Sequence, residues 1–183
     1  MKYAVIYSSK TGNTKKVAEA IHRVMPEGTG IYPVEEAPEA GQVEIPILGF
    51  WVDRGLPDEK MKSYIKKLKD KKRVGLFATL GAYPDSKHAV ETMERSKGLF
   101  EKNCRIFATF ICQGRIDPVL TEKFKKLPAD HPHAMTPERI ARHEAAKKHP
   151  DEIDLANAQE VFQKAVKYIC EEGEDSNDCE YSS

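Results

Sequence analysis

The sequence has little of what would tie the protein to nucleic acid, to a membrane or to the outside of the cell. Its 29 basic and 29 acidic residues balance to zero, which argues against duplex nucleic acid as the main partner, because such binding depends on uncompensated basic charge. No apolar run approaches the roughly 18 residues that a membrane span needs. The apolar run Tyr3–Tyr7 is too short for the h-region of a signal peptide. We therefore expect a soluble, cytoplasmic protein.

Several familiar motifs are also missing. None of the four cysteines forms a CxxC pair, so we expect free and mostly buried thiols, with a redox or metal role as the lesser alternative. The string GxxxxGK[ST] of nucleotide-hydrolysing P-loops does not occur, and Gly28-Thr29-Gly30 lacks the third glycine of a dinucleotide-binding GxGxxG. There is no nucleophile elbow.

The apolar residues that are present fall into alternating patterns. Near-continuous apolar runs predict buried strands, and apolar residues at helical spacing predict amphipathic helices between them. The expected strands are 2–7, 30–34, 43–52, 73–80 and 104–112, although Pro46 suggests that the third begins later. The expected helices are 14–25, with Asn13 or Thr14 as its cap, then 57–70, 86–103, 137–147 and 155–171.

Alternating strands and helices with short connections predict one α/β sandwich, in which a five-stranded parallel sheet is covered on both faces. Ligands of such sheets bind at the carboxyl ends of the strands. The loops 8–14, 49–55, 80–85 and 112–117 should therefore gather at one edge and form the functional site.

The loop between the first strand and the first helix has the composition of a phosphate site. It reads Ser8-Ser9-Lys10-Thr11-Gly12-Asn13-Thr14. Gly12 permits backbone angles that other residues resist, so the loop can turn its N–H groups toward an anion at the helix N-terminus. The hydroxyls of Ser9, Thr11 and Thr14 can add donors. The alternative is an ordinary polar turn with a helix cap.

At this point the chain resembles the flavodoxin family. Ser9 to Thr14 match that family's [ST]-x-T-G-x-T phosphate loop, and Leu48-Gly49-Phe50-Trp51 is similar to its second flavin loop. The resemblance covers about residues 1–172. It implies a doubly wound fold with strand order 2-1-3-4-5 and FMN bound non-covalently through its phosphate, with no metal. An insertion at about 126–153 and a disordered acidic tail at 173–183 complete the expected domain.

The resemblance also implies which loops would face the flavin. Phe50 and Trp51 point to opposite sides of an extended strand end, so one can enter the core while the other, with Val52 beside it, faces the ring. The large flat ring of Trp51, the only tryptophan, suits stacking on a flavin. Tyr83 would stack on the other face. Backbone groups of further loop residues would meet the edge of the ring, namely Thr79, Leu80, Gly81, Gln113 and Gly114. The alternatives are that Phe50 and Trp51 are both core aromatics and that Tyr83 is a surface turn residue.

Three departures from the family bear on function. The chain is neutral rather than strongly acidic, Val52 stands where a glycine would ease a peptide flip, and the insertion is additional. Arg54 and Arg115 should lie near the flavin edge, opposed chiefly by Asp53 and Asp117. Because positive charge stabilises an anionic reduced flavin, we expect a hydroquinone couple less negative than in acidic carriers.

The remaining motifs have plain interpretations. His131, His133, His143 and His149 lack a thiol or carboxylate at a convincing spacing for a metal site. The insertion that holds them could serve as a lid or docking surface, and the basic run at 66–73 suits the end of a helix.

Two functions compete, and a flavin-free binding module is a third possibility. The first is electron transfer through FMN, from a reductase to a partner enzyme such as a tetrapyrrole reductase. The second is an NAD(P)H-dependent FMN oxidoreductase acting on a quinone or tetrapyrrole.

Overall fold

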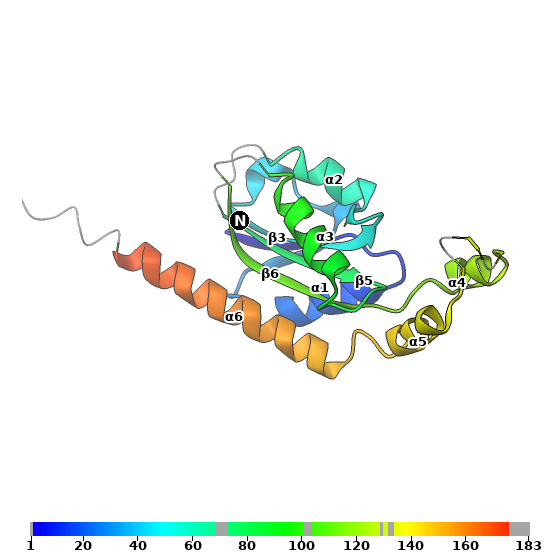
Figure 1. Ribbon diagram of the computed structural model, residues 1–183. Coiled ribbons are helices and arrows are strands. Elements are labelled where there is room, and N and C mark those ends of the chain that lie inside the picture. Colours follow the sequence, from blue (N-terminus) through cyan, green and yellow to red (C-terminus); the bar gives the residue numbers. More distant parts are fainter. Residues whose placement is uncertain (1, 69–72, 101–103, 129, 132–133, 176–183) are drawn as a thin grey trace, which may run out of the picture.

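The protein folds around a parallel sheet of five strands, seen in a computed structural model that describes residues 2–68, 73–100, 104–128, 130–131 and 134–175 (Figure 1). The strand order is β2-β1-β3-β5-β6, which confirms the expected 2-1-3-4-5 order of parallel strands. The five strands are β1 (Tyr3–Tyr7), β2 (Gly30–Pro33), β3 (Ile45–Asp53), β5 (Arg73–Leu80) and β6 (Arg105–Gln113).

The strands lie close to their predicted positions, and Pro46 falls inside β3 after all. Pro46 is paired with Ala4 of β1, whereas the pairing of β3 with β5 begins one residue later, at Ile47. The missing N–H of Pro46 therefore falls where no ladder bond to β5 is made, and a proline is tolerated there in a central strand.

The end of β3 is longer than expected and turns back on itself. Instead of an open loop over 49–55, β3 continues to Asp53 and pairs in antiparallel fashion with the two-residue strand β4 (Leu56–Pro57). The turn consists of Arg54 and Gly55, both with positive φ, at 50° and 76°. Two successive positive φ values suit the twist of a tight hairpin, and this hairpin was not predicted.

Helices cover both faces of the sheet, as the alternating pattern predicts. One face packs against α2 (Glu59–Ile65) and α3 (Lys87–Lys97), with Phe50, Leu76 and Met93 in its core. The other face packs against α1 (Asn13–His22) and α6 (Glu152–Asp175), with Phe77 and Phe162 in edge-to-face contact. Two short 3-10 helices, η1 (Val34–Glu36) and η2 (Ala40–Gln42), follow β2.

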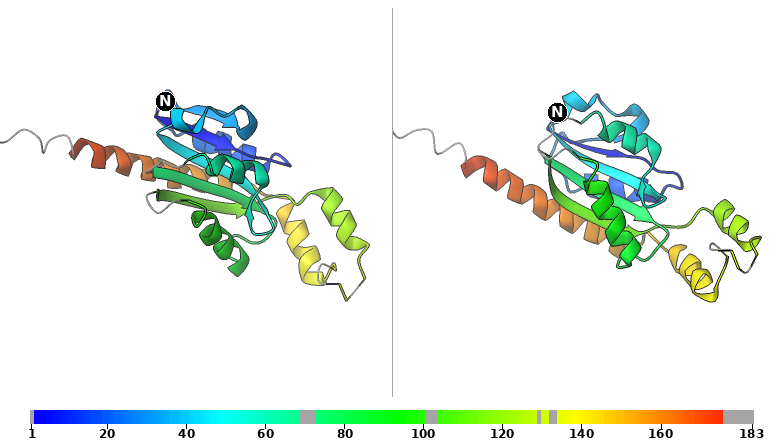
Figure 2. Two further views of the ribbon diagram at one scale, coloured as in Figure 1. Left: turned by 90° about the horizontal axis from the view of Figure 1, so that it is seen from above. Right: turned by 45° about the horizontal axis from the view of Figure 1, so that its top comes forward.

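The segment from Pro118 to Ala146 forms a pair of helices that stands beside the sheet rather than on it, so the insertion begins before the expected residue 126 (Figure 2). The helix α5 (Pro137–Ala146) is close to the predicted 137–147, and α4 (Pro118–Lys125) was not predicted. Asp117 caps α4 through a hydrogen bond from the Val119 N–H, and Pro118 occupies its first turn. An Asp-Pro start of this kind is a recognisable signal for a helix.

The carboxyl-terminal helix differs from its predicted limits at both ends. It begins at Glu152 and continues to Asp175, so residues 173–175 of the expected disordered tail are helical, while residues 176–183 lie outside the described part of the chain. Among the described residues, no helix combines the length and the apolar character needed to cross a bilayer.

Candidate functional site

The loop after β1 enters α1 without a side-chain cap. Gly12 is the residue before the helix, with φ of 86°, and no side chain bonds to the first helical N–H groups. The predicted cap by Asn13 or Thr14 is wrong, because both residues lie inside α1 and their side chains have other partners. The first N–H groups of α1 therefore keep their capacity to bind an anion, together with the positive end of the helix dipole.

Two long-range contacts fix the shape of this loop. Nδ2 of Asn13 donates to the hydroxyl of Thr11 and to the carbonyl of Arg115, both at 2.9 Å. The buried hydroxyls of Thr14 and Thr79 are hydrogen-bonded at 2.9 Å. The phosphate-type loop is thus tied to the carboxyl ends of β5 and β6, which the fold was expected to bring together.

Two neighbouring serines of the loop have opposite environments. The hydroxyl of Ser8 donates to Oδ1 of Asp58 at 2.8 Å, and the same oxygen accepts from the N–H of Lys60 at 3.1 Å at the start of α2. The hydroxyl oxygen of Ser9 is buried and has no hydrogen-bond partner. A buried hydroxyl without a partner is costly, and an anion in the loop would supply one.

A cavity of about 400 Å³ opens between this loop and the loops after β3, β5 and β6. Its volume lies in the range of sites for small molecules and cofactors. The predicted residues that line it are Lys10, Thr11, Asn13, Trp51, Val52, Thr79, Leu80, Gly81, Tyr83 and Gly114. The predicted residues Ser9, Gly12, Thr14, Phe50 and Gln113 are not part of its lining.

The two adjacent aromatics point in different directions, as their alternation along β3 requires. Phe50 is fully buried in the core beneath α2 and α3, whereas Trp51 is half-buried and lines the cavity. The ammonium group of Lys10 lies 5.5 Å from the centre of the Trp51 ring and 3.1 Å from a carboxylate oxygen of Asp117. One face of the only tryptophan is therefore beside a cation that belongs to the phosphate-type loop.

The other loops approach the cavity through backbone groups and small residues. The N–H of Gly114 donates to the carbonyl of Leu80 at 2.8 Å, and Nε2 of Gln113 donates to the carbonyl of Gly81 at 3.4 Å. Through this bond Gln113 supports the loop after β5 without lining the cavity itself. Tyr83 is 43% exposed and is available to a ligand. Arg54 and Arg115 both line the cavity, in agreement with their expected place.

The insertion supplies lining residues that the sequence did not single out for the site. They are Leu120 and Phe124 from α4, and Arg142 and His143 from α5. His143 is buried, and its Nδ1 lies 3.0 Å from the hydroxyl of Thr121. Burial, with Arg142 and Arg139 nearby, holds the pKa of His143 below its ordinary value. The one signal in the sequence that these residues lie near the site is that the insertion follows the last strand.

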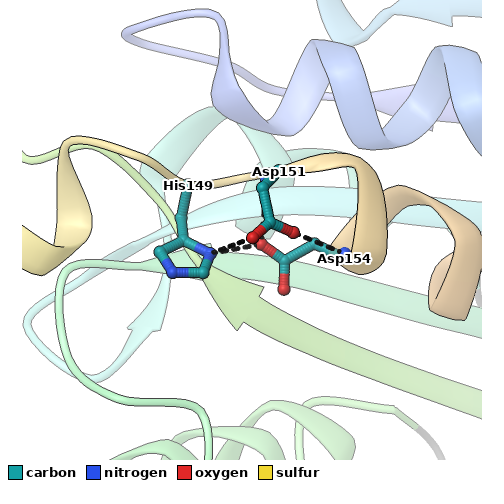
Figure 3. Close-up of side chains that lie close together, drawn as sticks. All are labelled: His149, Asp151 and Asp154. Carbon is teal, nitrogen blue, oxygen red and sulfur yellow. Dashed lines mark hydrogen bonds and ion pairs between the residues drawn. The ribbon is translucent and has the colours of Figure 1, made fainter.

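The expectation that no carboxylate stands near the histidines of the insertion at a suitable spacing is wrong for His149, which clusters with Asp151 and Asp154 (Figure 3). The cluster has the composition of a metal site, but its hydrogen bonds are those of a helix cap. Asp151 and Asp154 each accept the backbone N–H of the other at about 3 Å, which is the reciprocal pattern of a capping box at the start of α6. Nδ1 of His149 lies 2.5 Å from Asp154. The cluster holds the end of the insertion in place, and the His149 carbonyl accepts from the Arg115 N–H at 3.0 Å.

The remaining expectations about metal ligands and thiols concern His133 and the four cysteines. His133 and Cys179 lie outside the described residues. Cys104, Cys112 and Cys170 are free, as expected, and burial raises the pKa of the Cys112 thiol. A buried thiol of raised pKa is a poor nucleophile and a poor metal ligand.

Comparison with known proteins agrees with this arrangement. The model of a flavodoxin domain matches residues 4–163. A flavodoxin-like domain-containing protein BilS of Clostridioides difficile is 35% identical over 165 residues, covering 86% of this chain and 92% of that protein. The protein of the same description from Clostridium symbiosum is 28% identical over 183 residues, with 91% and 96% covered.

The likeness extends to solved structures. A flavodoxin from the domain Archaea superposes with a TM-score of 0.59 at 14% identity, covering 92% of this chain and 99% of that one. At this identity the likeness concerns the fold.

Proposed function

The chain belongs to the flavodoxin-domain family, and from this premise we propose that it binds FMN and transfers electrons through it. The observation that carries the proposal is that one loop holds both the uncapped N-terminus of α1, at Gly12, and the unpartnered hydroxyl of Ser9. Both are donors, both lie in the loop that matches the family's phosphate motif, and both lack an acceptor.

The residues present fit this cofactor. The loop Ser9–Thr14 would hold the phosphate with backbone N–H groups and hydroxyls, and Lys10 would add a positive charge. The cavity beside it would take the ring, with Trp51 on one side and Tyr83 on the other. The backbone of Leu80 to Gly81 and of Gly114 would face the polar edge of the ring.

When bound, FMN supplies one- and two-electron redox chemistry, and the protein contributes binding, orientation and local charge. Trp51 and Leu80 line the cavity with apolar surface and would shield a bound ring from water. Arg54 and Arg115, both exposed at its rim, favour negative charge on a bound ring. Asp117 opposes them only in part, because it is bonded to Lys10.

Titration with FMN and with riboflavin tests this proposal. Both carry the same ring, so their difference isolates the phosphate. We expect FMN to bind and riboflavin to bind at least about tenfold more weakly, because charge-assisted hydrogen bonds are lost with the phosphate. Equal affinities for FMN and riboflavin would contradict the assignment of the loop as a phosphate site. Absence of FMN binding would contradict the proposed function.

The role of electron carrier between a reductase and a partner enzyme, for instance a tetrapyrrole reductase, is our first interpretation. We place this chemistry in the cytoplasm, in keeping with the free cysteines among the described residues.

One observation favours an NAD(P)H-dependent oxidoreductase as the second candidate function: the insertion adds a wall to the cavity beyond the loops that would hold FMN, and this wall could shape a site for a second reactant. Stopped-flow mixing of the FMN-loaded protein with NADPH separates the two. Rapid bleaching of the flavin would indicate the oxidoreductase, and an unchanged spectrum would indicate the carrier.

A further inference from the structure

The helices α4 and α5 give the cavity a wall that differs in chemistry from its loops. Leu120 and Phe124 of α4 present apolar side chains, and Arg142 and His143 of α5 present nitrogen-bearing ones. The rings of Phe124 and His143 lie 6.4 Å apart at a tilt of 58°. Apolar surface beside one positive group is the composition of a site for an amphipathic small molecule.

Arg142 is the most unusual member of this wall. Its Nε is buried and has no hydrogen-bond partner. Burial lowers the pKa of its guanidinium, Arg139 lowers that pKa further, and Tyr83 acts the other way; no carboxylate of the described residues contributes. Arg142 as a whole is half-buried, but a buried guanidinium N–H without an acceptor is costly. The position therefore favours an acceptor from outside the chain, and a cation favours an anionic one.

The other charges at the cavity do not meet this need. Lys10, Arg54 and Arg115 line it as further cations, and the carboxylate of Asp117 is 3.1 Å from Lys10. His143, next to Arg142, is an imidazole and so supplies no negative charge. Its pKa is lowered, and its Nδ1 is bonded to the hydroxyl of Thr121. On the proposed function, the phosphate of FMN is held by a different element, the loop Ser9–Thr14.

We propose that the wall formed by Leu120, Phe124, Arg142 and His143 is a second binding subsite, which takes a small aromatic molecule bearing a carboxylate or similar anionic group beside the flavin. Arg142 binds the anionic group, and Leu120 and Phe124 contact the rings. This inference rests on the proposed function in so far as the flavin fills the rest of the cavity. The subsite favours anionic aromatic molecules among those that reach the flavin.

The test uses two probes of the same shape, 2-naphthoate and its neutral amide, 2-naphthamide, in calorimetric titrations of the FMN-saturated protein. We expect naphthoate to bind more tightly than the amide. Arg142→Gln should weaken naphthoate about tenfold or more while leaving the amide within twofold, because only the anion loses a charged hydrogen bond. Arg142→Lys should keep part of the preference. Lys148→Gln removes the same charge from an exposed position just after α5 and should change neither affinity.

Three outcomes would overturn the subsite. They are equal binding of the two probes to the unaltered protein, an equal loss of both in Arg142→Gln, and a loss of FMN affinity in that variant with naphthoate unchanged. The last would mean that Arg142 serves the cofactor. If the protein takes up no FMN at all, the proposed function fails by itself, and the preference for naphthoate measured without flavin still decides the role of Arg142.

Discussion

The hydroxyl of Ser8 donates a 2.8 Å hydrogen bond to the carboxylate of Asp58, fifty residues further along the chain. This bond joins the phosphate-type loop after β1 to the start of α2, across the end of β3. The next hydroxyl, that of Ser9, is buried without any partner. Ser8 therefore supports the fold, whereas the hydroxyl of Ser9 is free to bond to a ligand.

Exchanging each serine for alanine should therefore have opposite results. Ser8→Ala removes the side-chain donor of the buried Asp58 and leaves it only its backbone donors at the start of α2, so it should lower the free energy of unfolding by about 1–2 kcal/mol. Ser9→Ala removes a hydroxyl that has no partner, so stability without ligand should hold or rise slightly, while FMN affinity falls. Urea unfolding of the ligand-free protein and FMN titration of both variants check this. A Ser9→Ala protein with normal FMN affinity would contradict our assignment of the phosphate site.

Asp58 should make stability depend on pH in an unusual direction. Burial is the main cause that raises the pKa of its carboxyl above the ordinary 3.8, and bonds from Ser8 and from backbone N–H groups offset this in part. The folded state then holds the proton more tightly than the unfolded state. This group's contribution to stability is greatest below pH 3.8 and declines as pH rises through the raised value.

Asp58→Asn removes this titration and keeps a residue that can cap α2. We expect the variant to be as stable as the parent at pH 7 or more so, with a flatter profile between pH 4 and 7. Asp58→Ala should instead lose about 1–2 kcal/mol at all pH values, because cap and serine bond both go. Unfolding curves across this range are the measurement, and an unchanged pH profile in Asp58→Asn would rule out the raised pKa.

Trp51 and Phe50 are adjacent and should respond to substitution in different assays. Trp51→Leu removes a ring that lines the cavity, so FMN affinity should fall by about tenfold, in line with the contribution of one aromatic contact. Phe50→Leu alters a fully buried core ring, so stability should fall by about 1–2 kcal/mol with FMN affinity retained. The reverse result would mean that the alternation along β3 has been assigned to the wrong faces.

Arg54 and Arg115 should raise the potential of a bound flavin. Each is exposed at the rim of the cavity, so its effect is screened. Replacing either by glutamine should make the hydroquinone couple more negative by about 1 kcal/mol or less, which is about 40 mV for one electron. A redox titration followed by absorbance is the measurement. Lys148→Gln, which lies outside the cavity lining, is the control, and unchanged potentials in both arginine variants would refute the expectation.

The cluster of His149, Asp151 and Asp154 should behave as a cap and not as a metal site. Neither EDTA nor added Zn²⁺ should shift the thermal midpoint by much. Asp154→Ala should lower stability by about 1 kcal/mol through loss of the capping box. Glu152→Ala, in the same first turn but exposed, serves as the comparison. A midpoint that rises clearly with Zn²⁺ in the parent and not in Asp154→Ala would favour a metal.

The sequence by itself determined the order of the five parallel strands and of the helices that cover them, the place of the loop 8–14 and the family. These properties are written in short-range patterns: apolar runs for strands, helical spacing for helices, and a glycine with hydroxyls between β1 and α1. The same patterns correctly located α5, since an amphipathic helix is encoded within its own residues. They also gave the alternation of Phe50 and Trp51, and the flat ring of Trp51 pointed to it as the one that faces the cavity.

Only the tertiary structure decided the partners of the loop residues. Asn13 and Thr14 looked like caps, but contacts with Arg115 and Thr79, far along the chain, engage them instead. The approach of Arg142 to the cavity likewise depends on how distant segments meet in space. Pairings of that kind are set by the packing of the whole sheet and its helices, so no local window of sequence contains them.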